Sequence, residues 1–569
     1  MSDQKRVLLT SVFKPCGVDD AYGRKENISE LPHNQLTYYQ GIFSIRERYP
    51  SLNLHVIAAN LESPTTVLDW PTLERFEREL KKGYDYVGIA FIQPTFRKMQ
   101  KMVEITKEIS PRSKIILGWY GTSIDDIERI VDVDYICRGE GIGFMRGILG
   151  EPGEYRYRHP AVFAYHLGTM GVPSSFLAQA GGRFSKRLEN NFVGMLATGV
   201  GCSEGCDFCS TGQFFPGGYI PFIRSGREIF ELMAESERKY GTQRFAIIGN
   251  ENFFCDRDKI EELHRCLVKA DKIYDIYLSF GSVNHLSQFD PRFLSELGLG
   301  IVWIGIESRY HLYHKNQGVD IPALVRNLHD WGIKTCLSSI LCLDEHTKET
   351  IREDIDWHLS LKPILSQFAH LSPAQGTKLW RRLIKEERIL HSIPVEDRHA
   401  FKQIWFKHPH FTPYESELIQ KEAYLRDYHE LGPTVVRWIE NNYRAYPHLV
   451  GSGSRLLAQR AALLKQRMRI YKMILWAAER LVPTGKMAEQ IRDLRRELEK
   501  DFGKMGAVDR AGAAGLYLLG KKKEIELKWF GDVIQPKTVV TYFNEQNRNQ
   551  AVGVIPGNLK VKSKKMPNS

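Results

Sequence analysis

Short apolar runs alternate with amphipathic stretches over most of the first 385 residues, and this alternation restricts what the chain can fold into. Two series are present, with five apolar runs between residues 5 and 150 and six between 192 and 385. Apolar strands that alternate with helical segments are typical of parallel sheets covered by crossover helices. We therefore expect two successive α/β units.

The first unit, residues 1–150, is expected to be a doubly wound, Rossmann-like domain. Its predicted elements are strands at 6–13, 52–61, 84–92, 114–121 and 133–141, and helices at 34–48, 72–82, 95–109 and 123–131. Ligands bind such sheets beyond the carboxyl ends of the strands. Glycines that let backbone approach a ligand fall there, namely Gly118, Gly121, Gly139 and Gly141.

The second unit, residues 191–385, repeats strand and helix six times. Its predicted elements are strands at 192–200, 244–250, 276–283, 301–308, 334–343 and 364–372, and helices at 226–239, 258–270, 291–297, 321–331 and 347–360. Six repeats indicate a partial (β/α)6 barrel, although the pattern alone does not distinguish a barrel from an open sheet.

The remaining parts of the chain carry weaker signals. Residues 151–190 lack sustained periodicity and are expected to be a linker, and residues 386–505 are charged and mostly helical. A small C-terminal segment, 506–569, has weak strand signals at 525–530 and 537–542. It ends in a basic tail that we expect to be disordered.

Composition excludes several classes of protein. Apolar residues make up 43% and charged residues 26%, which is ordinary for a soluble globular protein. There is neither a run of ~18 apolar residues nor a secretory signal, so we expect a cytoplasmic protein. Nine cysteines are then reduced thiols or metal ligands rather than disulfides. The net charge of +11 favours an anionic partner.

One basic stretch, 455–482, places apolar residues on one helical face between arginines and lysines. One interpretation is a helix that lies on a membrane surface beside a lipid-like substrate, with peripheral membrane association. The other is a bundle helix with a solvated basic face. Nucleic acid is not expected as a partner, because the sequence contains no recognised RNA-binding module.

The strongest motif is a cysteine triplet directly after the first strand of the second unit. Cys202, Cys206 and Cys209 have the spacing C-x3-C-x2-C. Three thiolates on one tight loop can hold three irons of a [4Fe-4S] cluster and leave the fourth iron open. Structural zinc is the alternative, but it needs four ligands. Cys255 or Cys266 could supply a fourth, although neither belongs to a second paired-cysteine motif.

At this point the sequence resembles the radical S-adenosylmethionine (SAM) superfamily. The triplet, the aromatic Phe208 before its last cysteine and the preceding strand carry the resemblance, which extends over about residues 5–385. The first unit resembles the cobalamin-binding domain that one class of these enzymes carries. The helical region, residues 386–505, lies outside the resemblance.

The resemblance implies a cofactor set and a reaction. Cys202, Cys206 and Cys209 would hold the cluster, and S-adenosylmethionine would bind its open iron and yield a 5′-deoxyadenosyl radical. The implied reaction is cobalamin-dependent methylation of an unactivated carbon, with a flavodoxin or ferredoxin as electron donor. The alternatives are a radical SAM enzyme without cobalamin activity, doing C–C coupling, cyclisation or oxidation, and a non-catalytic iron–sulfur or zinc protein.

The resemblance also suggests positions that would contact S-adenosylmethionine. Asn250 and Glu251 end the second strand, where a carboxylate can accept from an ammonium, and Glu307 and Ser308 end the fourth, where they suit ribose hydroxyls. Ser282, Ser339 and Phe208 complete the set. The alternative for each is an ordinary loop or strand-end residue.

Cobalamin binding is left open by the sequence. Many cobalamin domains use D-x-H-x-x-G after the first strand, but residues 14–23 contain no histidine and His33 lies too far along. If cobalamin binds, the four glycines Gly118, Gly121, Gly139 and Gly141 are the expected contacts. The substrate and the oligomeric state cannot be inferred from the sequence.

Overall fold

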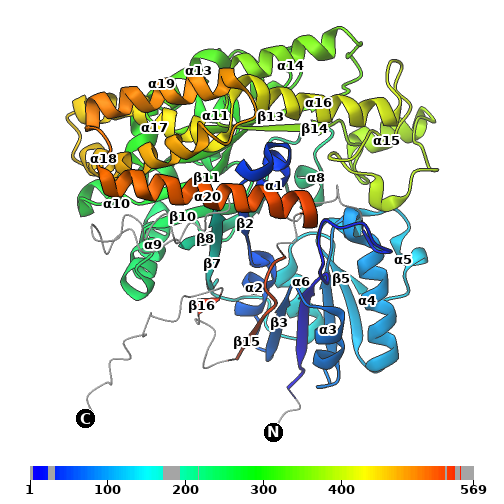
Figure 1. The fold of residues 1–569 in the computed structure, drawn as a ribbon. Coiled ribbons are helices and arrows are strands. Elements are labelled where there is room, and N and C mark those ends of the chain that lie inside the picture. The colour runs from blue at the N-terminus through cyan, green and yellow to red at the C-terminus, as the bar shows by residue number, and fades with distance from the viewer. Residues whose placement is uncertain are drawn as a thin grey trace, which may run out of the picture.

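The structure is a computed structural model, and it shows two parallel sheets and a helical bundle (Figure 1). It describes residues 4–23, 32–168, 170, 192–215, 217–531, 535–544 and 551–552. The expected disordered tail lies outside these residues, as does most of the second half of the expected linker.

The first unit is a doubly wound sheet, as predicted. Its strand order is β15-β3-β1-β4-β5-β6, with every pair parallel except β15 and β3. The strands are β1 (Val7–Ser11), β3 (Thr65–Asp69), β4 (Tyr86–Ala90), β5 (Lys114–Gly118), β6 (Tyr135–Ile136) and β15 (Val539–Phe543). Separate apolar cores form on its two faces. One includes α3 (Leu73–Leu80) and α4 (Phe96–Ile109), and the other includes α2 (Leu52–Ala59) and α6 (Gly141–Leu149).

Three predictions for this unit were wrong. The apolar run 52–61 is the helix α2 rather than a strand, because it is buried between the sheet and the second unit and therefore lacks a polar face. The true second strand, β3, is short and contains two threonines, and it was missed. The expected helix at 34–48 is a helical turn, α1 (Pro32–Thr37), a 3-10 segment and a strand, β2 (Arg46–Arg48).

The second unit has six strands that each pair in parallel with the next strand of the series, which is the order of a barrel. They are β8 (Phe192–Gly201), β10 (Arg244–Asn250), β11 (Asp275–Gly281), β12 (Ile301–Glu307), β13 (Lys334–Leu341) and β14 (Leu365–His370). The connecting helices are α9 (Gly226–Tyr240), α10 (Arg257–Ala270), α11 (Val283–Leu286), α12 (Pro291–Glu296), α13 (Ile321–Asp330) and α14 (Thr350–Ser360). Within the described ranges β14 does not pair with β8, so the barrel is open and partial as predicted.

The expected linker supplies a strand to this sheet. Within residues 151–190, β7 (Ala161–Gly168) pairs antiparallel with β8, and β2 of the first unit pairs with β7. The last described strand, β16 (Ala551–Val552), also pairs with β7, and β9 (Tyr219–Pro221) pairs with the far end of β8. Chain segments far apart in sequence therefore extend the β8 edge of the half-barrel sheet.

The two α/β units pack face to face. One continuous core contains Val56 of α2 and Ile142 of α6 together with Met195, Ala246 and Leu365 from strands of the half-barrel. The helices α2 and α6 therefore lie between the first sheet and the concave face of the second. A second core, on the other side of the barrel strands, includes residues of α9, α10, α12 and α13.

The C-terminal region is helical, but its helices begin later than expected. The long helices are α16 (Pro413–Leu431), α17 (Thr434–Gly451), α18 (Arg455–Ala478), α19 (Gly485–Phe502) and α20 (Ala507–Phe530), after the shorter α15 (Lys378–Lys385). α18 packs against α17, α19 and α20, and its apolar side chains are buried between them. The stretch 455–482 is therefore a bundle helix, and the alternative of a membrane-surface helix there was wrong.

Two strands were expected in the C-terminal segment 506–569, and one of these predictions was wrong. Residues 525–530 form the last turns of α20 rather than a strand. The apolar positions Ile525, Leu527 and Trp529 alternate, which favours a strand, but contacts such as Lys521–Glu524 stabilise a helix. The strand predicted at 537–542 is β15, and its partner β3 belongs to the first unit. Within the described ranges no helix has the length and hydropathy needed to cross a bilayer.

A buried ion pair joins the bundle to the half-barrel, and its loss should be costly. Asp427 of α16 accepts two hydrogen bonds from Arg437 of α17, at 2.9 and 2.7 Å, and one from Ser366 of β14 at 2.6 Å. Because Asp427→Ala would leave the buried guanidinium unpaired, we expect a loss of about 3–5 kcal/mol. Thermal or urea unfolding would measure it. Asp132→Ala, at an exposed pair with Lys107, is the control and should change the midpoint little.

Candidate functional site

The cysteine triplet lies on a loop at the carboxyl end of β8. Gly201 ends the strand at φ +90°, and a Cβ there would lie 2.0 Å from the carbonyl oxygen of Gly218. The Cys202 N–H donates to that same oxygen at 2.8 Å. The glycine is thus required both by its dihedral and by the close backbone. These contacts fold the loop back on the turn that precedes β9.

The three thiols are free and share one environment. Cys206 is buried, and Cys202 and Cys209 are half-buried. Burial raises the pKa of Cys202 to about 11 and that of Cys206 to about 12, and each also feels the charge of Cys209. Among the described residues, no group of three or more His, Cys, Asp or Glu side chains is arranged so that it could hold a metal ion. The loop supplies three soft donors, a number that suits three irons of a cluster but not a four-ligand zinc site.

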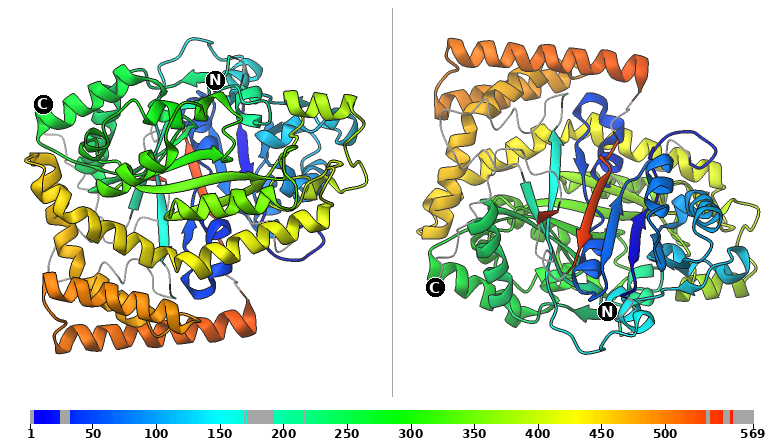
Figure 2. Two further views of the ribbon diagram at one scale, coloured as in Figure 1. Left: turned by 90° about the horizontal axis from the view of Figure 1, so that it is seen from above. Right: turned by 90° about the horizontal axis from the view of Figure 1, so that it is seen from below.

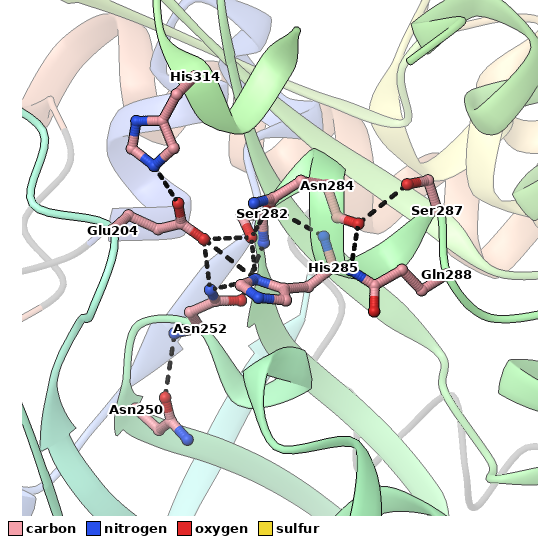
Figure 3. A network of polar contacts seen from close by, with 9 residues as sticks. All are labelled: Glu204, Asn250, Asn252, Ser282, Asn284, His285, Ser287, Gln288 and His314. Atoms are coloured by element: carbon pink, nitrogen blue, oxygen red, sulfur yellow. Dashed lines mark hydrogen bonds and ion pairs between the residues drawn. The ribbon is translucent and has the colours of Figure 1, made fainter. Parts of the chain in front are cut away.

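A carboxylate inside the triplet organises the surroundings of the loop (Figure 3). Glu204 accepts hydrogen bonds from Asn252 and from Ser282, both at 3.0 Å. His285 Nδ1 lies 3.0 Å from one of its oxygens, and His314 Nε2 lies 2.7 Å from the other. Burial opposes the charge of Glu204, but the hydrogen bond from Ser282 and the charge of His285 hold its pKa below the usual value. Glu204 therefore ties the loop to the ends of two neighbouring strands.

Only part of this network was expected from the sequence. Ser282 was predicted, and Asn250 lies at its edge, where its side-chain oxygen accepts from the Asn252 N–H at 3.1 Å. Glu204, Asn252, His285 and His314 were missed. The one available signal was the place of Glu204 between two cysteines, since the others come from separate loops.

Glu251 points to a different part of the site. Its backbone N–H donates to Gly201, but within the described part of the chain its carboxylate has no hydrogen-bond or ion-pair partner. Burial raises the pKa of Glu251 to about 7. Its charge also contributes to the raised pKa of Tyr120, after burial itself, so the two side chains are close. An unpaired, half-buried carboxylate suits a cationic ligand.

Tyr120 brings the first unit to the cysteine loop. It follows β5, and its hydroxyl lies 3.1 Å from that of Thr211, in the helix α8 (Ser210–Phe214) directly after Cys209. Its ring packs against Phe214, with 5.0 Å between centroids. The preceding Trp119 has φ +74°, a strained value for a residue with a side chain. The crevice of the first sheet and the cysteine loop of the second are thus adjacent.

An apolar cavity of about 90 Å³ lies beside this contact. It opens between the carboxyl ends of β4 and β5, the helices α2 and α6, and the end of β8. Gly118, Gly139 and Gly141 line it, together with Trp119, Cys137, Val200, Phe215 and Phe222. Gly121 is not among the lining residues, and a Cβ there would lie 2.3 Å from the ring of Phe91. None of the lining residues is a histidine.

The remaining positions predicted to contact S-adenosylmethionine each have a partner within the protein. Glu307, at φ +57°, pairs with Lys315 at 2.5 Å, and the charges of both act on Cys206. Phe208 packs against Tyr313, with ring centroids 4.9 Å apart. Ser308 accepts from the Tyr310 N–H, and Ser339 lies 2.7 Å from His358. The last two serines have local partners, which is consistent with a structural role.

Half-buried polar and aromatic side chains lie on adjacent barrel strands, and these too were missed. Trp303 of β12 stacks on Phe280 of β11, with 5.6 Å between centroids. Its indole N–H donates to Gln367 of β14 at 3.3 Å, and Ser338 of β13 donates to the same oxygen at 2.6 Å. This group offers a flat aromatic surface with a polar edge.

Comparisons with known proteins give distant matches. No family model matches the sequence. An uncharacterized methyltransferase of Pyrococcus horikoshii, PH0819, is 21% identical over 369 residues, which cover 60% of this chain and 78% of that protein.

Solved structures also match, among them two of TsrM from Kitasatospora setae, a radical S-adenosylmethionine methyltransferase. The one with tryptophan and a SAM analogue is 15% identical, covers 67% of this chain and 76% of its own, and has a TM-score of 0.47. The one with cobalamin and a [4Fe-4S] cluster is also 15% identical with a TM-score of 0.47, and covers 75% and 85%. At these values we draw no functional conclusion from the likeness.

The unpaired Glu251 predicts a pH-dependent stability. A carboxyl whose pKa rises from 4.5 to about 7 on folding binds more protons in the folded state, so stability falls as pH increases between these values. Glu251→Gln cannot ionise. At pH 8 the free energy of unfolding of the variant should therefore exceed that of the wild type by about 2 kcal/mol, which a higher unfolding temperature would show. Near pH 4.5 the two proteins should unfold at similar temperatures. Parallel pH profiles for the two proteins would contradict this, and Glu104→Gln, at an exposed carboxyl, is the control.

Proposed function

We propose that this chain is a radical SAM enzyme. The observation that carries the proposal is the position of three free thiols on one loop at the carboxyl end of the first strand of a six-stranded parallel half-barrel. Beside them is a half-buried carboxylate, Glu251, without a partner among the described residues. A [4Fe-4S] cluster at this loop would supply the single electron that cleaves the sulfonium of S-adenosylmethionine.

The residues of the chain have distinct tasks in this proposal. Cys202, Cys206 and Cys209 hold the cluster, and Glu204 fixes the loop through its four polar contacts. Glu251 accepts from the ammonium of S-adenosylmethionine, which would remove the cost of its buried charge. Glu307, held by Lys315, is placed to accept from ribose hydroxyls. The packed aromatic groups Tyr120, Phe214 and Phe215 exclude water from the reacting centre.

We further propose that the first unit binds cobalamin and that the reaction is methylation of an unactivated carbon. A cobalamin would supply the methyl group for transfer. The apolar cavity suits a fused aromatic ring system such as the benzimidazole base, and its three lining glycines allow close approach. The lack of a lining histidine means that the cavity offers no imidazole ligand for cobalt. Similarity to a curated methyltransferase also supports methyl transfer.

The alternative within the same class is radical chemistry without cobalamin, such as C–C coupling, cyclisation or oxidation. The missing histidine favours it, whereas the cavity beside the cysteine loop favours the methylase. A purely structural iron–sulfur or zinc protein is disfavoured by the unpaired Glu251, because a structural site has no use for an uncompensated carboxylate whose charge is partly desolvated.

The substrate is proposed to be a small molecule that binds on the concave side of the half-barrel. The stacked Trp303 and Phe280, with the Ser338–Gln367 pair, offer it a flat surface and a polar edge. A lipid-like substrate loses the support of the stretch 455–482, since α18 is buried. A flavodoxin or ferredoxin as electron donor and a cytoplasmic location remain part of the proposal.

Anaerobic reconstitution with iron and sulfide tests the central proposal. The wild type should bind about four irons per chain and convert S-adenosylmethionine to 5′-deoxyadenosine when reduced. Replacing any one of Cys202, Cys206 or Cys209 by alanine should abolish both. Cys255→Ala, at a half-buried cysteine outside the triplet, is the matched control and should retain both. Triplet variants with normal iron content would overturn the proposal.

The cobalamin proposal has its own test. A Cβ at Gly118 meets no atom within 4 Å, so Gly118→Leu should fold and fill the cavity. We expect the variant to retain about tenfold less cobalamin than the wild type after gel filtration. It should keep its iron and still form 5′-deoxyadenosine. Gly147→Leu is the control, because Gly147 is also unobstructed but is exposed on α6. Equal retention by both variants would favour the reaction without cobalamin.

A further inference from the structure

The outward face of α20 carries large apolar side chains that are mostly exposed. Leu518 is 65% exposed, Ile525 58% and Trp529 72%. Their spacings of seven and four residues place them along one line of the helix surface. Both views in Figure 2 show α20 at the outer edge of the molecule, beyond the rest of the bundle.

The orientation of this face is fixed by what lies behind it. On the opposite side of α20, Ala513, Leu516 and Gly520 are buried, and the helix packs against α18. A Cβ at Gly520 would lie 2.5 Å from Leu481, so the helix approaches its neighbour closely. The helix therefore cannot turn its apolar line inward without losing the packing that it has.

Lysines accompany the apolar line. Lys522 lies within it, and Lys521 and Lys528 lie along one edge by helical spacing. Lys521 contacts Glu524 at 2.8 Å and Lys522 contacts Glu526 at 3.7 Å, but both are exposed pairs of the kind that contribute little. Lys528 has no ion-pair partner among the described residues. Residues 546–569 of the sequence add five basic side chains and no acidic one.

These features favour a lipid surface over a protein partner. Lysine is depleted in protein–protein interfaces, whereas lysines beside tryptophan and aliphatic residues are typical of helices that lie in the membrane interface. The line from Leu518 to Trp529 is about 16 Å long at 1.5 Å per residue, and Phe530 extends it at 73% exposure. A basic chain with a net charge of +11 is complementary to an anionic leaflet.

We propose that α20 is a membrane-docking helix. Leu518, Ile525 and Trp529 enter the boundary between headgroups and acyl chains of an anionic bilayer, and Lys521, Lys522 and Lys528 contact lipid phosphates. The helix lies in the plane of the interface and does not cross it. This proposal is independent of the radical chemistry, because it uses none of the residues placed at the cysteine loop or in the apolar cavity.

Vesicle co-sedimentation of the full-length protein tests the docking. The probes are vesicles of phosphatidylcholine with about one third phosphatidylglycerol, and vesicles of phosphatidylcholine alone. We expect the wild type to bind the anionic vesicles, to bind the neutral ones weakly, and to lose binding in high salt. The double variant Ile525→Ser with Trp529→Ser should bind the anionic vesicles about tenfold more weakly. Tyr414→Ser removes an aromatic that is 68% exposed on α16, and as the matched control it should bind like the wild type.

Three results would overturn the proposal. They are absence of wild-type binding to both kinds of vesicle, equal binding of the double variant and the wild type, or a wild-type dimer in sedimentation velocity that the double variant converts to a monomer. The last result would assign the face to a second copy of the chain. Unchanged unfolding midpoints would show that the variants are folded. Unchanged formation of 5′-deoxyadenosine without vesicles would separate a docking failure from a failure of the proposed chemistry.

Discussion

The carboxyl ends of two parallel sheets meet in this molecule, and the rest of the structure depends on that juxtaposition. A parallel sheet places its ligand-binding loops at one edge only, so two such units can share a site only if these edges face each other. The shared core of α2, α6 and the concave strands of the half-barrel fixes this arrangement. Tyr120 then reaches Thr211 beside the cysteine loop, and the apolar cavity forms between the two edges. Neither edge alone would enclose it.

The same packing explains which parts of the fold could be predicted. The six strands of the half-barrel and five of their helices were located within a few residues, because each helix has one buried and one solvated face and each strand is a short apolar run. The helix α2 was mistaken for a strand because both of its sides are covered. The strand β3 was missed because it is short and contains threonine, and its register is set by β1 and by β15 from the other end of the chain.

Long-range pairing also limited the prediction of the candidate site. The cysteines and Glu251 are recognisable locally, since each follows a predicted strand and carries its chemistry in a few adjacent residues. The partners of Glu204 are not recognisable in this way, because Asn252, His285 and His314 come from three different connections between strands and no spacing joins them. Gly121 also lies at the end of a predicted strand, and the ring of Phe91 leaves no room for a side chain there, so packing alone already accounts for a glycine at that position.

Glu204 and Glu251 differ in how far their neighbours compensate the charge of the carboxylate. Both are carboxylates near the cysteine loop, and burial opposes the charge of each. Four polar neighbours compensate Glu204, so its pKa lies below the usual value and its charge holds the loop. No described neighbour compensates Glu251, so its pKa rises to about 7 and its charge destabilises the folded protein. A partly buried charge that the fold leaves unpaired lowers stability unless a cation pairs with it. A ligand that brings an ammonium group to the cysteine loop would remove this cost, and the gain would contribute to its binding free energy.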